Sequence, residues 1–239
     1  ASLLLSNDTI KFDTVFTSTG SITQSFKIIN NNNQKLLLSK IKLMGGNNSC
    51  FKININGANS TELSDVEIDS NDSIYIFVSV NINPNNSNLL FLIRDSISIQ
   101  YNGNERFVQL EAYGQNAHFY TDKIIDNDTA WNNDIPYVIL GKLQINNNAT
   151  LTLNEGCRLY FHANAPLIVK GTLRVNGNKN NEVIFRGDRT DEYYNDLPAS
   201  WPGIYFLPSS KDNIITYGII KNATGRLGIR TARGNAGRW

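Results

Sequence analysis

The chain has 239 residues and a formal net charge of +1, from 22 Lys and Arg against 21 Asp and Glu. Hydrophobic residues make up 41 % of the chain, enough for the core of one large domain or two ordinary ones. The balanced charge argues against a nucleic-acid-binding protein, which needs a basic surplus to neutralise phosphates. No apolar run approaches the ~20 residues that span a bilayer as a helix.

Asparagine is unusually frequent. The sequence contains 35 Asn and 27 Ile but only 12 Ala. Asn favours turns and Ile favours strands, whereas a helix-rich protein would carry more Ala. We therefore expect an all-β protein.

Residues 1–117 contain a series of short segments with strand character. The clearest is residues 73–82, where five apolar residues alternate with their neighbours: Ile74, Ile76, Val78, Val80 and Ile82. This period of two is typical of a strand that buries one face. The other candidate strands, with Asn or Gly turns between them, cover residues 9–16, 22–29, 36–44, 51–55, 66–68, 91–100 and 106–113. The spacing predicts a β-sandwich of about seven strands over residues 1–117.

The pattern changes after residue 117. Residues 118–134 are polar and lack alternation, so we expect a linker in which Trp131 packs onto one neighbouring domain. From residue 135 onward, apolar pairs at i, i+2 alternate with Asn- or Gly-bearing corners. Gly141-Lys-Leu143-Gln-Ile145-Asn146 recurs as Gly171-Thr-Leu173-Arg-Val175-Asn176. This pattern predicts the start of a parallel β-helix over residues 135–239 and favours it over a second sandwich.

The C-terminal segment lacks the character of a cap. The stretch after Ile229 carries few apolar residues, so the last coil would leave strand edges and core exposed. We expect the β-helix to be incomplete here, with further polypeptide or another protein covering its last coil.

Two long stretches resemble a known family. Residues 8–46 (DTIKFDTVFTSTGSITQSFKIINNNNQKLLLSKIKLMGG), followed by DSIYIFVSVNINPN, resemble the N-terminal Ig-like domain of Bacteroidetes surface lipoproteins. The stretch that begins YVILGKLQINNNATLTLNEGCRLYFH is similar to the right-handed parallel β-helix that follows that domain in the same family. The resemblance extends to Ile229. It implies a lipid anchor upstream of Ala1 and carries over no catalytic residue.

An acidic, aromatic segment interrupts the predicted β-helix at residues 187–201. Its candidate ligand residues are Asp188, Asp191, Glu192, Tyr193 and Tyr194. Carboxylates and tyrosines beside a β-helix groove could bind a glycan or Ca²⁺, whereas the alternative is a solvated loop whose tyrosines pack on the coil below. Paired carboxylates do not recur on successive coils, as a glycosidase would need.

Three aromatic residues of the same region form a second candidate site. Trp131, Trp201 and Tyr205 would make a sugar-stacking platform if they were exposed together. The alternative is that they pack at the corners of the coils.

Asp-Ser or Asp-Thr followed by an aliphatic residue or Ala occurs five times. Bacteroidetes attach O-linked glycans at this three-residue pattern, so the candidate modified residues are Thr9, Thr14, Ser73, Ser96 and Thr129. The alternative is that these pairs begin strands, because the Asp carboxylate accepts a nearby backbone N–H.

Cysteine and histidine give no sign of a metal or cofactor site. Cys50 and Cys157 fall in different predicted domains and are expected to be separate thiols rather than a disulfide. His118 and His162 lack the spacing of metal ligands, and no zinc or EF-hand motif occurs. We expect no metal and no cofactor.

The sequence and the resemblance together lead to one functional hypothesis and two alternatives. The first is a non-enzymatic lipoprotein of the outer membrane and cell surface that acts as a scaffold, adhesin or docking subunit. Its partners would be surface proteins or a surface glycan, with no nucleic acid, and it would contact the membrane only through its lipid. The alternatives are a β-helix module that binds or cleaves a polysaccharide, and an accessory subunit of an outer-membrane complex.

Overall fold

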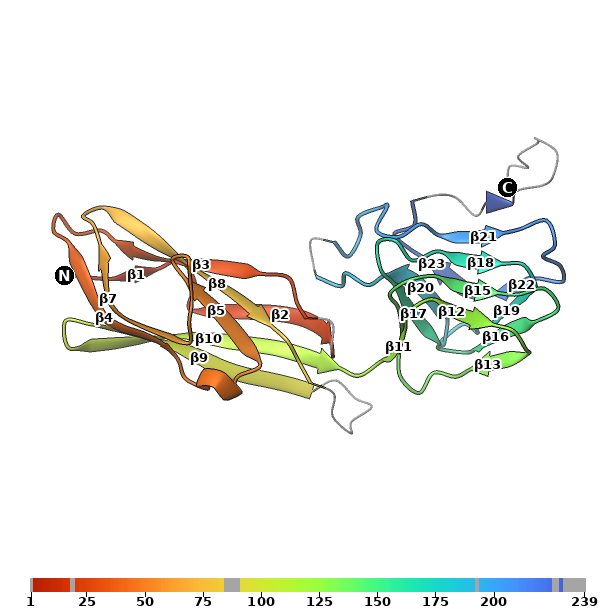
Figure 1. The fold of residues 1–239 in the computed structure, drawn as a ribbon, viewed down its shortest axis with the longest axis horizontal. Coiled ribbons are helices and arrows are strands. Elements are labelled where there is room, and N and C mark those ends of the chain that lie inside the picture. Colours follow the sequence, from red (N-terminus) through yellow and green to blue (C-terminus); the bar gives the residue numbers. More distant parts are fainter. Residues whose placement is uncertain (1, 18–19, 84–90, 192–193, 225–227, 230–239) are drawn as a thin grey trace. The chain divides into compact units, whose positions relative to one another are not determined.

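A computed structural model describes residues 2–17, 20–83, 91–191, 194–224 and 228–229 (Figure 1). Within these ranges the regular secondary structure is almost entirely strand, and the one helical element is a 3₁₀ turn, η1 (Gly46–Asn48). The chain divides into two compact units, Ala1–Asn116 and Ala117–Trp239. Across the described residues, helices of the length and apolar character needed to cross a membrane are absent.

The first unit is a sandwich of two five-stranded sheets. Sheet A has the order β1 (Leu4–Leu5), β3 (Gln24–Asn30), β8 (Asp72–Val80), β5 (Phe51–Ile55), β6 (Ala58–Asn59). Sheet B has the order β2 (Thr9–Phe16), β10 (Asn104–Gln115), β9 (Phe91–Tyr101), β4 (Leu36–Leu43), β7 (Glu62–Ile68). The predicted sandwich is confirmed, with more strands than the expected seven, because two-residue strands such as β1 and β6 are too short to alternate.

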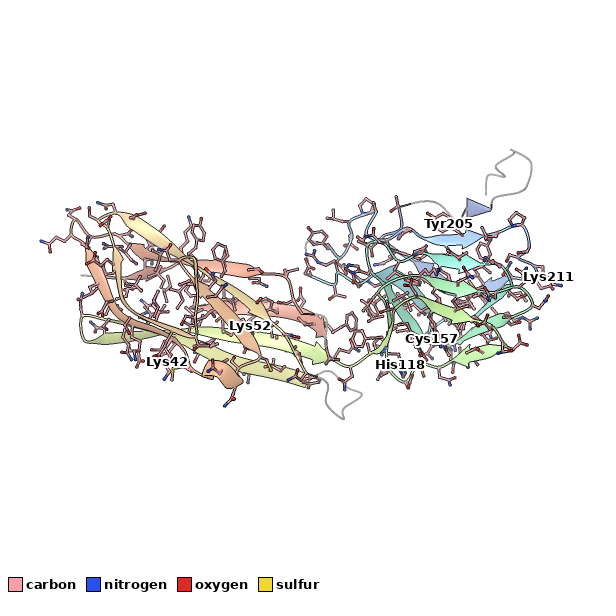
Figure 2. All side chains as sticks on the ribbon, in the orientation of Figure 1. Lys42, Lys52, His118, Cys157, Tyr205 and Lys211 are labelled. Atoms are coloured by element: carbon pink, nitrogen blue, oxygen red, sulfur yellow. The ribbon has the colours of Figure 1, made fainter. Side chains whose placement is uncertain are left out.

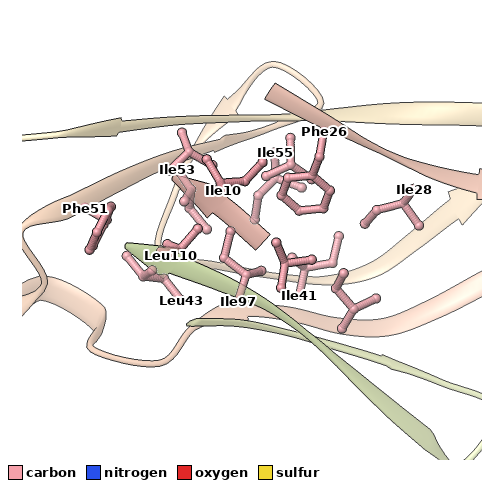
Figure 3. Packing of buried hydrophobic residues seen from close by; sticks show 14 of the residues in the cluster. Ile10, Phe26, Ile28, Ile41, Leu43, Phe51, Ile53, Ile55, Ile97 and Leu110 are labelled. Carbon is pink, nitrogen blue, oxygen red and sulfur yellow. The ribbon is translucent and has the colours of Figure 1, made fainter. Parts of the chain in front are cut away.

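The core of the sandwich lies between the two sheets. Figure 3 shows side chains of both sheets pointing into this layer, including Phe26 and Ile53 from sheet A and Ile41 and Leu110 from sheet B. All five alternating residues of the 73–82 segment are buried there, as predicted. In strand β2 the buried side chains are Ile10 and Phe12 and then Val15, so the spacing changes from two residues to three. The change coincides with a shift in pairing with β10 between Ala112 and Tyr113, which moves the inward-facing positions of β2 by one residue.

The second unit is a three-sided parallel β-helix. Face 1 comprises β11 (His118–Tyr120), β14 (Tyr137–Ile139), β17 (Arg158–Phe161), β20 (Val183–Gly187) and β23 (Gly218–Ile220). Face 2 comprises β12 (Lys123–Ile125), β15 (Leu143–Ile145), β18 (Leu167–Val169), β21 (Ile204–Phe206) and β24 (Gly228–Ile229). Face 3 comprises β13 (Thr129–Trp131), β16 (Thr150–Asn154), β19 (Thr172–Asn176) and β22 (Ile214–Thr216). Each strand pairs in parallel with the corresponding strand of the next coil, which confirms the predicted β-helix.

The expected linker at residues 118–134 is wrong. This segment forms β11, β12 and β13, the first coil of the β-helix, and each strand pairs with a strand of the second coil. Trp131 is buried within the β-helix core. Three-residue strands with a polar residue at their start are too short to show alternation, which is why the sequence pattern missed them.

The Gly-x-Leu-x-Ile/Val-Asn repeat does not mark equivalent positions of successive coils. Gly141 precedes β15 on face 2, whereas Gly171 precedes β19 on face 3. Leu143 pairs with Leu167 on face 2, and Leu173 pairs with Leu151 on face 3. Both copies therefore mark a corner followed by a strand, but the two strands lie on different faces of the β-helix.

The C-terminal segment from which a cover over the last coil was predicted lies mostly outside the described residues, at 225–227 and 230–239. Within the described part, Ile204 and Phe206 of β21 are buried. Ile215 of β22, which is in register with buried Val175, remains partly exposed.

Candidate functional site

In the acidic loop between β20 and β21, Asp188 and Asp191 each contact a different nitrogen-bearing side chain. Asp188 Oδ2 lies 2.7 Å from His162 Nδ1. Arg189 Nε donates to Asp191 Oδ1 at 2.9 Å, and this hydrogen bond raises the pKa of the guanidinium. Of the described carboxylates, Asp188 and Asp191 thus contact two different nitrogen groups.

The aromatic and amide side chains of the loop also contact its arginines. The Arg189 guanidinium lies 3.7 Å from the ring centroid of Tyr194, and Arg186 Nη2 donates to Asn195 Oδ1 at 3.2 Å. Glu192 and Tyr193 lie outside the described residues. In the described part of the chain, three His, Cys, Asp or Glu side chains never gather closely enough to hold a metal ion.

The aromatic platform considered for Trp131, Trp201 and Tyr205 does not exist. Trp131 is buried against Tyr137 with 4.3 Å between ring centroids, and Trp201 is fully buried against Phe161 at the same separation. Only Tyr205 on β21 is exposed. The two tryptophans therefore pack inside the β-helix, as the alternative interpretation held.

The five candidate glycosylation residues all lie in strands and are all half-exposed. At two of them the structure shows the alternative role of the preceding aspartate. Asp72 Oδ1 accepts the backbone N–H of Ser73 at 2.7 Å, and Asp95 Oδ1 accepts that of Ser96 at 2.7 Å. Modification remains a prediction for Thr9, Thr14, Ser73, Ser96 and Thr129.

The cysteines and histidines occupy separate environments. Both thiols are free, Cys50 half-exposed and Cys157 buried with its Sγ 3.2 Å from the Trp131 carbonyl oxygen. Burial raises the pKa of the Cys157 thiol to about 11. His118 Nε2 lies 3.0 Å from Asp134 Oδ2. Burial opposes ionisation of Asp134, but hydrogen bonds from the Ile135 backbone and from His118 outweigh it and lower the pKa of this carboxyl.

A surface that the sequence analysis did not single out lies on the outer face of sheet A. Tyr75 and Phe77 of β8 are 42 % and 41 % exposed. Their rings are 5.8 Å apart between centroids and within 15° of parallel, and Lys27 Nζ lies 4.8 Å from the centroid of Tyr75. The signal was present in residues 73–82, because the odd positions point away from the core and two of them are aromatic rather than polar.

A hollow of about 750 Å³ adjoins Phe77 on this face. Lys52 of β5, which Figure 2 labels, is one of the residues around it. The lining residues come from η1, β5, β6, β8 and the adjoining turns: Thr23, Gly46, Asn47, Ser49, Phe51, Lys52, Ile53, Asn54, Asn59, Ser60, Thr61, Phe77 and Ser79. The exposed aromatic pair and this hollow together form a candidate surface site on the sandwich.

Comparison with known proteins gives only distant structural likeness. No model of a protein family matches the sequence, and no curated protein matches it. The PapD-like domain 7 of human CEP192 matches 48 % of this chain and 84 % of its own, with 8 % identity and a TM-score of 0.30. The CooA pilin subunit of enterotoxigenic Escherichia coli matches 47 % of this chain and 95 % of its own, with 12 % identity and a TM-score of 0.31.

An enzyme also matches at the same low level. A family 123 glycoside hydrolase from Clostridium perfringens shares 10 % identity, with a TM-score of 0.33 over 48 % of this chain and only 26 % of the hydrolase. The chain thus spans about a quarter of that enzyme. Likeness at these TM-scores carries no argument about activity.

Proposed function

We propose that this chain is a non-enzymatic surface protein that acts as a scaffold or docking subunit, held to the outer membrane by a lipid upstream of Ala1. The pairing of the loop carboxylates supports the non-enzymatic part. Hydrolysis of a glycosidic bond uses two carboxyl groups that flank one bond. Here Asp188 pairs with His162 and Asp191 pairs with Arg189, and these separate pairings favour a scaffold over a hydrolase.

The location comes from the resemblance to Bacteroidetes surface lipoproteins in which an Ig-like domain precedes a β-helix. An all-β chain with a sandwich followed by a parallel β-helix accords with that order of domains. We therefore propose that this chain shares the cellular location of that family as well as its order of domains.

The docking part rests on the outward rows of the β-helix. On face 2, one row runs in register through Ile124, Gln144, Ile168 and Tyr205. Parallel strands hold such residues about 4.8 Å apart, and the hydrogen-bonded coils keep them rigid. A partner that binds this row meets a preformed surface and loses little conformational entropy on the scaffold's side.

Labelling and protease digestion in the native cell test the location. A clickable fatty-acid analogue should label the protein, and proteinase K added to intact cells should digest it. Unlabelled protein that resists the protease on intact cells but is digested after lysis would contradict the proposal.

Incubation with a polysaccharide panel tests the non-enzymatic part. The purified chain should release no new reducing ends from neutral or acidic polysaccharides. Release that is abolished by Asp188→Asn or Asp191→Asn would establish the polysaccharide-cleaving alternative.

Substitution on face 2 tests docking. In mildly solubilised native membranes, the pair Ile168→Ser and Tyr205→Ser should lower the native mass of the complex that contains this chain. The matched control is Thr152→Ser on face 3, which should leave that mass unchanged. If the pair Ile168→Ser and Tyr205→Ser left the native mass as unchanged as the control does, docking through face 2 would be contradicted.

A further inference from the structure

The aromatic pair on sheet A lies in the middle of a polar surface. In the register of the sheet, Phe77 of β8 lies beside Ser25 of β3 on one side and Asn54 of β5 on the other. Asn54 in turn pairs with Asn59 of β6. An exposed ring is therefore bordered by a hydroxyl and by two carboxamides, all on the solvent side of the sheet.

The two carboxamides are held in fixed positions. Asn54 Nδ2 donates to Asn59 Oδ1 at 2.6 Å, and Asn54 Oδ1 accepts the Gly57 N–H at 2.8 Å. Within the described ranges, Asn59 Nδ2 has no hydrogen-bond partner. Asn59 of β6 thus presents an amide donor that lines the hollow.

The hollow beside Phe77 has the lining of a site for a hydroxyl-rich ligand. Most of its side chains are hydroxyls and amides, from Thr23, Asn47, Ser49, Asn54, Asn59, Ser60, Thr61 and Ser79. Lys52 is the single charged residue among those that line it. Lys27 lies over the neighbouring ring of Tyr75, so the charged groups identified around the aromatic pair are cations.

We propose that the outer face of sheet A binds an oligosaccharide. A pyranose has an apolar face of C–H groups and an edge of hydroxyls. The C–H face would pack on the rings of Phe77 and Tyr75, while the hydroxyls would exchange hydrogen bonds with Asn59 and the other polar groups of the hollow. Lys52 adds a preference for a sugar that carries a carboxylate.

Two other ligand classes fit this surface less well. A nucleic acid would need several basic side chains along its path, and the chain as a whole carries a net charge of only +1. A protein partner would need desolvated apolar pockets for its anchor residues, whereas this hollow is lined mainly by polar groups. The residues of this site all belong to the sandwich, so the proposal does not rest on the scaffold function or on membrane anchoring.

Calorimetric titration with defined hexasaccharides tests the proposal. The probes are cellohexaose, xylohexaose, mannohexaose and hexagalacturonic acid, each added to the purified full chain. We expect binding of at least one probe, with hexagalacturonic acid bound more tightly than the neutral sugars. Phe77→Ala and Tyr75→Ala should each weaken the Kd about tenfold or more, the range expected for loss of one stacked ring.

The sandwich offers matched controls on its opposite sheet. Phe107 and Tyr113 of β10 are 42 % and 48 % exposed on sheet B, so Phe107→Ala and Tyr113→Ala remove equally exposed rings. These controls should leave the Kd within twofold of the unsubstituted chain. Lys52→Gln should remove the preference for hexagalacturonic acid, whereas Lys11→Gln on sheet B should not.

Nuclear magnetic resonance locates the contact and separates it from misfolding. The side-chain amide signals of Asn54 and Asn59 should shift on titration with the bound probe, and the unfolding midpoints of Phe77→Ala and Phe107→Ala should agree closely. Failure of all four probes to bind would overturn the proposal. Binding that Phe77→Ala and Tyr75→Ala leave intact would also overturn it, and so would a protein ligand that depends on Phe77 in the absence of any sugar binding.

Discussion

The indole ring of Trp201 lies against the phenyl ring of Phe161, with 4.3 Å between centroids and 13° between planes. Trp201 lies at the C-terminal end of the acidic segment, and its Nε1 donates to the Lys221 carbonyl oxygen at 2.7 Å. The loop therefore returns to the β-helix through a fully buried anchor that joins β17 of one coil to the segment after β23. This contact makes Trp201 a structural residue rather than a sugar-binding one.

Replacement of Trp201 should destabilise the β-helix. Trp201→Ala removes a large buried ring and should lower the free energy of unfolding by about 3–5 kcal/mol. Trp201→Phe keeps the ring contact but loses the hydrogen bond to Lys221, so it should cost about 1 kcal/mol from that bond. Urea denaturation followed by fluorescence and circular dichroism measures both. Equal stability of the Ala variant and the unsubstituted chain would disprove the anchoring role.

Cys157 should make the protein less stable in alkali. The folded-state pKa of this thiol is raised by burial from 9.0 to about 11, so the thiol ionises first in the unfolded chain. Between pH 9 and 11 the unfolded state binds fewer protons than the folded state, and the free energy of unfolding falls as the pH rises, by about 2–3 kcal/mol.

Denaturation curves across this pH range measure the effect. Cys157→Ala should flatten the fall between pH 9 and 11, and Cys50→Ala should not. Because the Tyr137 pKa is also raised by burial, to about 12, some fall above pH 10 should persist in Cys157→Ala. A slope that is unchanged in Cys157→Ala would be inconsistent with this assignment.

Gly171 should not accept a side chain. A Cβ at this position would lie 2.3 Å from the carbonyl oxygens of both Ala149 and Asn146, and these backbone atoms are held by the coil below. Gly171→Ala should therefore cost about 3 kcal/mol or more. Gly46 offers the comparison, because a Cβ there meets open space and the cost of Gly46→Ala comes from its φ of +53° alone, about 1–2 kcal/mol. Thermal unfolding of both variants should show the larger loss for Gly171→Ala.

Peptide mapping of protein from its native cell should find O-linked sugar at one or more of the five candidate residues, and more of it at Ser73 or Thr129 than at Ser96. Ser73 is next to the first residue of β8, and Thr129 is the first residue of β13. Ser96 instead lies within β9, which pairs with β10 on one side and β4 on the other. A native protein whose intact mass equals that of the unmodified polypeptide would refute modification at all five residues.

The sequence by itself predicted the all-β class, most of the longer strands and many of their buried residues. Alternation in residues 73–82 predicted the five buried side chains of β8 and its continuation, because a strand that covers a core must repeat its apolar residues every second position. The apolar pairs Leu143/Ile145 and Leu167/Val169 likewise predicted β-helix strands, and all four residues are buried. Local periodicity is sufficient for these elements because the alternation of apolar residues within one strand indicates which of its faces is buried.

Only the tertiary structure decided which residues meet. The three short strands of residues 118–134 are recognisable as a coil only through their pairing with the second coil. The pairing of Asp188 with His162 joins positions on different coils, which no local pattern encodes. The same holds for the surface around Phe77, where Ser25, Asn54 and Asn59 come from three other strands. Strand register brings these side chains together, and register depends on contacts between segments that are distant in the sequence.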